Sequence, residues 1–187
     1  TFELFASDMN PYEVNVDELA PWVPMMRAMP HRLSNVDVQR PQNVLQVWGL
    51  NGRYNDEASE RSVIASGWAW SSQFGDLNND GYLDLYSVNG MIDVELFKYL
   101  PGGELVERNQ AFRNQGNGNF APAPEWNLGS TASGRGMVLA DLNNDGRLDA
   151  VVNNLRSPAQ LFENQICEQG GALEVDLNWP ESKNSYA

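Results

Sequence analysis

Apolar and polar residues alternate along GWAWSSQFG at 67–75, where Trp68, Trp70 and Phe74 share one parity. A period of two predicts a half-buried strand, and the large apolar area of a tryptophan favours packing of Trp68 and Trp70 in the core. A second β-rich run, with Leu and Tyr residues, follows at 83–86. The pattern therefore predicts two strands joined by the loop at 76–81.

That loop reads DLNNDG, and the same six residues return 65 positions later at 141–146. In both copies one variable residue and then Leu-Asp follow, and the register that aligns the loops also places Phe74 on Leu139. Self-similarity at a fixed period is the signature of a repeat architecture. We therefore expect the second loop to join two strands as well.

A second element repeats between the loops. The stretch 43–54 aligns without gaps on 109–120, and a decayed copy of its first half stands at 160–165. Both full copies carry an Asn-Gly pair, Asn51-Gly52 and Asn117-Gly118, between β-like runs. Because Asn and Gly tolerate positive φ, this pair predicts hairpins closed by type I′ turns.

These repeats divide the chain into three units at 1–66, 67–131 and 132–187, each blade-like and built of antiparallel strands.

Two long connecting segments, here called the excursions, interrupt the units. Residues 10–41 carry five prolines, which exclude a central strand and leave room for a helical turn near 17–28. The segment 94–100 is expected to form a short helix that ends at Pro101.

The start of the chain aligns with the strand that follows an acidic loop, so that Glu3 corresponds to Asp84 and Asp149. Glu3 is therefore expected to bind no calcium. Three units fall short of the roughly four to eight blades that close a propeller. We expect open sheet edges, which are completed by further chain before Thr1 or by association of copies into a homo-oligomer.

Charge narrows the classes of partner. The chain has 12 Lys and Arg against 25 Asp and Glu, a formal net charge of −13, and its basic residues are scattered. This balance argues against nucleic acid and favours cations as ligands. No apolar run approaches the length of about 18 residues that spans a bilayer, so membrane insertion is not expected. The single cysteine, Cys167, excludes an internal disulfide and leaves the compartment and its own role open.

The acidic loops have the spacing of a calcium site, D-x-N-x-D-G-x-x-D. Side-chain oxygens stand at positions 1, 3, 5 and 9, a backbone carbonyl is available at position 7, and glycine at position 6 permits the sharp turn. Calcium takes six to eight such hard oxygen ligands in flexible geometry, whereas magnesium demands a stricter octahedron. We therefore predict two Ca²⁺ sites. Their ligands are Asp76, Asn78, Asp80, Tyr82 (carbonyl) and Asp84 in the first loop, and Asp141, Asn143, Asp145, Arg147 (carbonyl) and Asp149 in the second.

Two other kinds of loop share part of this sequence pattern. Solvated Asx turns would use the same residue types, but three neighbouring carboxylates repel one another unless a cation is present. An EF-hand or dockerin loop needs a carboxylate at position 12 and flanking helices. Position 12 is Ser87 in one loop and Val152 in the other, and the flanks read as strands, which excludes this class.

Three features occur in order: Phe74-Gly75-Asp76 at the beginning of the loop, the acidic loop itself, and the later hairpin FRNQGNGNF at 112–120. This combination resembles the FG-GAP/VCBS repeats of β-propellers, which also occur in integrin α-subunits. More narrowly, 67–93 and 134–164 resemble the last repeats of the ASPIC/UnbV family, which includes the cartilage acidic proteins. The resemblance implies calcium at the ten residues named above. It also implies that SKNSYA at 182–187 opens the module that follows the repeats in that family.

On this basis the expected function is a non-enzymatic, calcium-binding module for adhesion or protein–protein interaction in an extracellular or periplasmic protein. The signal for export would then lie outside this chain. No catalytic residue and no further cofactor are expected, since no motif surrounds the lone His31. Two alternatives stay open, a propeller enzyme that acts on polysaccharide as a lyase or hydrolase, and a glycan-binding lectin.

Overall fold

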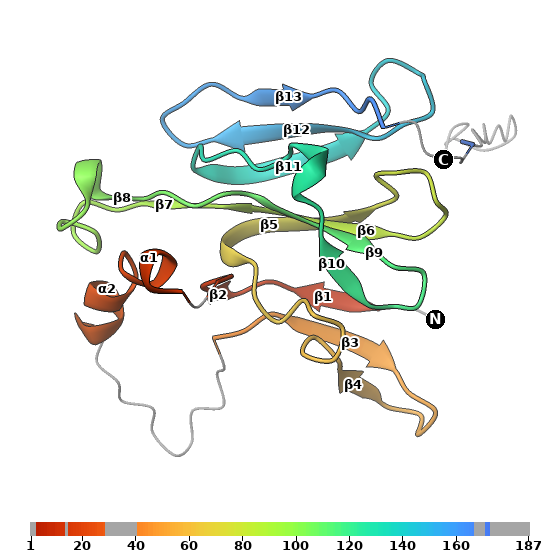
Figure 1. The fold of residues 1–187 in the computed structure, drawn as a ribbon, viewed down its shortest axis with the longest axis horizontal. Helices are drawn as coiled ribbons and strands as arrows, with labels where there is room; N and C mark the ends of the chain where they lie inside the picture. The colour runs from red at the N-terminus through yellow and green to blue at the C-terminus, as the bar shows by residue number, and fades with distance from the viewer. Residues whose placement is uncertain (1–2, 14, 29–40, 167–170, 173–187) are drawn as a thin grey trace, which may run out of the picture.

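The computed structural model describes residues 3–13, 15–28, 41–166 and 171–172. The predicted all-β, antiparallel fold class is confirmed, because the described residues form antiparallel sheets with only short helices. Figure 1 shows three sheets stacked side by side, with the helices beside one end of the middle sheet.

The middle sheet has the order β10-β9-β6-β5-β2. Its strands are β2 (Met9–Asn10), β5 (Gly67–Gly75), β6 (Asp84–Asn89), β9 (Gln110–Asn114) and β10 (Phe120–Pro122). All six residues of β6 are buried, as expected of a central strand that is covered on both faces. Four consecutive antiparallel strands, β5, β6, β9 and β10, correspond to one propeller-type blade.

The other two large sheets repeat parts of this pattern. One has the order β1-β3-β4 and the other the order β11-β12-β13. Their strands are β1 (Leu4–Ala6), β3 (Val44–Trp48), β4 (Tyr54–Asp56), β11 (Gly134–Ala140), β12 (Asp149–Asn154) and β13 (Gln160–Phe162). The repeat register places β3 on β9 and β11 on β5, so equivalent sequences occupy equivalent strands.

Two apolar clusters hold the three sheets together. Leu45 of β3, Leu85 of β6 and Phe112 of β9 pack between the first and middle sheets. Tyr86 of β6 and Val152 of β12 belong to the cluster between the middle and third sheets. Consecutive residues of β6 thus serve opposite interfaces, because side chains alternate across a strand.

The excursions form a cap at one end of the middle sheet (Figure 1). It contains α1 (Val16–Leu19), α2 (Val23–Ala28), the paired strands β7 (Met91–Ile92) and β8 (Glu104–Leu105), and η1 (Pro101–Gly103). Trp22 and Met25 pack there against Trp68 and Phe97. The helical turn near 17–28 is confirmed, whereas 94–100 forms successive turns instead of a helix. The Phe97 amide donates to the Asp93 carbonyl four residues back, but the Leu100 amide donates only three residues back, to Phe97, so the helical ladder does not continue.

Two local predictions need correction. Trp68 is buried, but Trp70 is 43% exposed and its ring lies 4.4 Å from the Arg135 guanidinium carbon. A register shift between Ala69 and Ser71 breaks the alternation of β5, so Trp70 leaves the core face.

Both predicted Asn-Gly hairpins form, but their loops span residues 49–53 and 115–119. Only glycines among these residues have positive φ, which excludes type I′ turns because such turns need positive φ at two consecutive residues.

Candidate metal centre

The first acidic loop joins β5 to β6 and is closed by its own carboxylates. Asp76 accepts hydrogen bonds from the amides of Asp80 (3.0 Å) and Gly81 (2.9 Å). Asp80 in turn accepts from the amide of Tyr82 at 2.9 Å. The chain can turn this sharply because Asn79 and Gly81 adopt φ values of 57° and 89°.

The second loop, between β11 and β12, repeats this arrangement bond for bond. Asp141 accepts from the amides of Asp145 (3.1 Å) and Gly146 (2.8 Å), and Asp145 accepts from that of Arg147 (3.0 Å). Asn144 has φ 59°, like Asn79. Identical local sequence therefore produces an identical turn in two different sheets.

The asparagines at position 3 point into their loops. The Asn78 amide nitrogen donates to Asp80 Oδ2 at 2.8 Å, and that of Asn143 donates to Asp145 Oδ2 at 3.0 Å. Asn78 is buried, whereas Asn143 is exposed. Positions 1, 3 and 5 thus converge within each loop, as the spacing predicts.

The aspartates at position 9 are buried and have a further role. Asp84 accepts from the amides of Leu77 (2.9 Å) and Asn114 (2.8 Å), and Asp149 accepts from those of Leu142 (3.1 Å) and Asn164 (2.8 Å). Burial raises the pKa of Asp84 to about 6, although the two backbone hydrogen bonds that it accepts act in the opposite direction. These aspartates tie each loop to the third strand of its sheet.

Asn114 and Asn164 complete the loops and were not among the predicted site residues. The side chain of Asn114 donates to the carbonyl of Leu83 (3.1 Å), and that of Asn164 donates to the carbonyl of Leu148 (3.1 Å). The signal was present in the repeated F-x-N-Q at 112–115 and 162–165. Because the asparagine is distant in sequence from the loop, spacing alone did not connect the two.

Arginines lie beside both position-5 carboxylates. The Arg147 guanidinium pairs with Asp145 and donates to the carbonyl of Asn164 at 2.8 Å. Arg113 lies 3.9 Å from Asp80 Oδ2. These cations offset part of the negative charge of the loops. Glu3, the third aligned acid, lies 4.0 Å from Arg61.

The oxygen donors fit calcium in chemical type. Carboxylates and an amide oxygen are the hard ligands that calcium takes, and a carboxylate oxygen that accepts one N–H retains a second lone pair. Within the described part of the chain, however, no three His, Cys, Asp or Glu side chains are grouped closely enough to hold a metal. Calcium at these loops therefore stays a prediction, and binding would require the side chains at positions 1, 5 and 9 to reorient.

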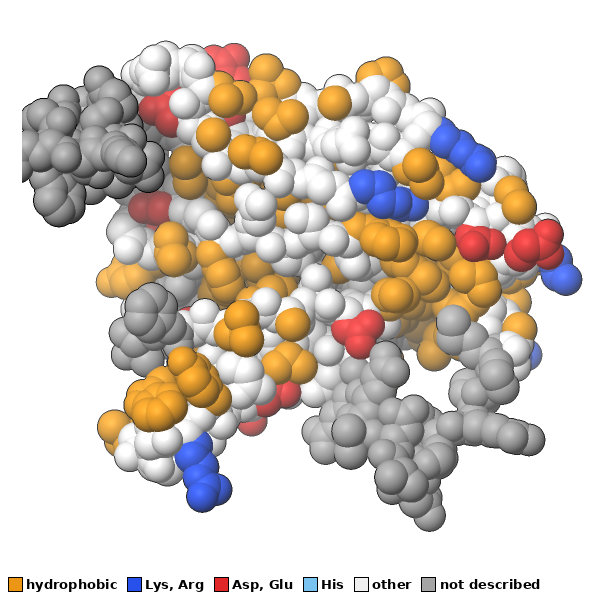
Figure 2. Space-filling view, turned by 180° about the vertical axis from the view of Figure 1, so that it is seen from behind, with side chains coloured by type: hydrophobic (Ala, Val, Ile, Leu, Met, Phe, Trp, Pro, Cys, Tyr) orange, Lys and Arg blue, Asp and Glu red, His pale blue; other side chains and the backbone are white. Residues whose placement is uncertain are grey.

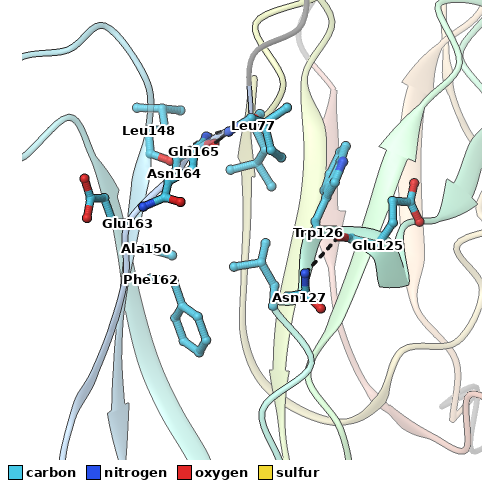
Figure 3. A pocket seen from close by; sticks show the side chains of 12 residues that line it. Leu77, Glu125, Trp126, Asn127, Leu148, Ala150, Phe162, Glu163, Asn164 and Gln165 are labelled. Atoms are coloured by element: carbon cyan, nitrogen blue, oxygen red, sulfur yellow. Dashed lines mark hydrogen bonds between the residues drawn. The ribbon is translucent and has the colours of Figure 1, made fainter.

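The two loops contact each other directly. The side chain of Asn79 donates to the carbonyl of Gly146 at 2.9 Å, and that of Asn164 reaches the carbonyl of Leu77 at 2.7 Å. Figure 3 shows the cavity beside this junction, between the middle and third sheets. It measures about 580 Å³, and Leu77 and Leu148 of the two loops form part of its lining.

The apolar lining of this cavity also includes Trp126 of η2 (Pro124–Trp126) and Phe162 of β13. The carboxylates of Glu125 and Glu163 point away from it, on opposite sides (Figure 3). Elsewhere, Lys and Arg side chains are scattered over the face drawn in Figure 2.

Comparison with known proteins supports the repeat. Residues 93–152 match the FG-GAP-like repeat. The FG-GAP-like match extends from the end of β7 into β12 and includes the whole second acidic loop. It covers less than half of the chain, and the comparison with curated proteins gave no match.

Several predictions concern residues outside the described ranges. His31, Cys167 and the segment 182–187 all lie there. Within the described residues, no helix has the length and apolar character that crossing a bilayer requires.

Proposed function

We propose that this chain is a non-enzymatic, calcium-binding repeat module for protein–protein interaction or adhesion in an exported protein. The observation that carries the proposal is the recurrence of one loop conformation, with the same backbone amides on equivalent carboxylates, in two sheets. A turn that only reversed the chain would not need an aspartate at positions 1, 5 and 9 of both copies. We also propose that these repeats are of the kind found in the ASPIC/UnbV family, as their resemblance in sequence suggests.

The residues that would hold calcium are the carboxylates at positions 1, 5 and 9, the asparagine oxygens at position 3 and the carbonyls of Tyr82 and Arg147. When bound, calcium would neutralise the converging carboxylates of each loop. The chain itself positions the loops, because Asp84 and Asp149 hold each loop against the third strand of its sheet. Millimolar extracellular calcium would fill even weak sites of this kind.

The loops would also connect calcium to a protein-binding surface. Leu77 and Leu148 belong to the loops and line the cavity of Figure 3, so ordering the loops would fix part of its wall. The occupant that suits the cavity is an apolar side chain of a partner protein, because Leu77, Leu148 and Phe162 give it an apolar lining.

Titration calorimetry with calcium on the metal-free protein tests the proposal. We expect two binding events per chain, of which one disappears in Asp80→Ala and the other in Asp145→Ala. Selection of displayed peptides in calcium and in chelator should enrich apolar sequences only in calcium. Absence of any calcium-binding heat would refute the metal role, and turnover of a polysaccharide would refute the non-enzymatic one.

A further inference from the structure

A second cavity lies at the end of the middle sheet opposite the acidic loop. The antiparallel register of β5 and β6 places Gly75 beside Asp84 at the loop end and Ala69 beside Asn89 at the other. The cavity measures about 330 Å³, within the lower range of small-ligand sites. Gly67 and Asn89 line it at the ends of β5 and β6, together with Glu18 of α1 and Glu107, which precedes β9.

Asn89 is a buried side chain with an unused acceptor. It is fully buried, and its amide nitrogen donates to the carbonyls of Ser66 (2.6 Å) and Arg108 (2.8 Å). Those two carbonyls fix the orientation of the amide group, since neither could accept from the oxygen. Within the described residues Oδ1 has no hydrogen-bond partner. A buried acceptor without a partner is costly, so the site calls for a donor.

Glu107 is held rigidly next to Asn89. Its Oε1 accepts from the Trp22 indole at 2.9 Å, and its Oε2 accepts from the Trp68 amide at 2.6 Å. A Cβ atom at Gly67 would lie 2.9 Å from the Asn89 amide nitrogen and 3.2 Å from Glu107 Oε2. Glycine at this position, with φ 102°, therefore leaves the space in which the two side chains approach each other.

The charges around the cavity are mainly negative. Glu13, Glu18 and Glu107 contribute carboxylates to the lining, against one guanidinium from Arg108. That guanidinium is directed at the carbonyl of Gly129, 3.5 Å away. A ligand that enters must therefore bring hydrogen-bond donors and positive charge.

We propose that this cavity binds an aliphatic primary ammonium group. One N–H would satisfy Asn89 Oδ1, and the positive charge would lie against Glu107 and Glu18. An ammonium suits the site better than a divalent metal, since the acceptor without a partner is a single neutral amide oxygen. The group could belong to a free alkylamine or to a lysine side chain.

The test is calorimetric titration of the full chain with two ammonium probes, n-butylammonium and Nα-acetyl-lysine amide. Acetyl-norleucine amide, which has no ammonium, is the neutral control. We expect the ammonium probes to bind and the neutral one not to bind. Stronger binding of acetyl-lysine amide would indicate a lysine side chain as the natural occupant, and stronger binding of butylammonium would indicate a free amine.

Glu107→Gln keeps an acceptor for Trp22 but removes the charge, and should weaken binding by about tenfold, the cost of a charge-assisted hydrogen bond. Glu60→Gln, at an exposed residue outside both cavities, is the matched control and should bind as the parent does. Circular dichroism of both variants checks that the fold is retained. Equal affinity for the neutral analogue, unchanged affinity in Glu107→Gln with retained fold, or no binding by either ammonium probe would overturn the proposal and leave water as the occupant.

Discussion

The side-chain amide of Asn79 in the first acidic loop donates a 2.9 Å hydrogen bond to the backbone carbonyl of Gly146 in the second. Two copies of one motif, 65 residues apart in sequence, are thereby joined at their turns. Both loops leave their sheets at the same end (Figure 1). This hydrogen bond is a direct contact between the two loops.

Asn79→Gly should lower the free energy of unfolding by about 1 kcal/mol relative to Asn144→Gly, because it removes this bond. Both asparagines have φ near 60°, so glycine is equally compatible with the backbone at either position. Asn144 makes no hydrogen bond among the described residues, which makes it a matched control. Urea denaturation of the two variants gives the difference, and equal stabilities would show that the contact contributes nothing.

Removal of calcium should lower the melting temperature. A site filled at about 100 times its Kd adds about 2.7 kcal/mol to the stability of the folded state. Differential scanning calorimetry in calcium and in chelator measures the change, with metal removal verified by elemental analysis. An unchanged melting curve would contradict a structural role for calcium.

Asp80→Ala and Asp145→Ala should each remove calcium binding at their own loop, because these aspartates occupy the central ligand position. Titration calorimetry should then show one remaining site in each variant. His31→Ala, at a residue outside the described ranges, serves as the control and should keep both sites. Two sites of full affinity in Asp80→Ala would disprove the assignment of the first loop.

Asn164→Ala should destabilise the protein more than Asn114→Ala. Asn164 donates to carbonyls of both loops, at Leu77 (2.7 Å) and Leu148 (3.1 Å), whereas Asn114 donates to Leu83 of its own loop. Each carbonyl left without a donor costs about 1–3 kcal/mol if buried. Thermal unfolding of the two variants checks the order, and the reverse order would indicate that the link between loops is weak.

Stability should fall as the pH rises from about 4.5 to about 7, through the titration of Glu107. Burial raises its pKa from 4.5 to about 7, with Glu18 adding to the increase. In this interval the folded state binds more protons than the unfolded state, so the slope of stability against pH is negative. Glu107→Gln should flatten this part of the curve, measured by denaturation in a pH series, and identical curves for variant and parent would contradict the shift.

The local elements follow from local sequence. The spacing of Asp, Asn and Gly in DLNNDG fixed both turns, because their hydrogen bonds join residues two to five positions apart. Alternation and the Asn-Gly pairs likewise determined the strands and hairpins, and the repeat register assigned equivalent strands to equivalent sequences. The predicted calcium ligands at positions 1, 3 and 5 needed no tertiary information to be brought together.

Which distant residues meet depends on how the strands and sheets pack. The register shift in β5 moved Trp70 out of the core, although its parity matched that of Trp68. Asp84 accepts a hydrogen bond from the amide of Asn114, and Glu107 accepts one from the indole of Trp22, 85 residues away in sequence. Such bonds depend on strand register and on the packing of whole sheets, which local periodicity does not encode.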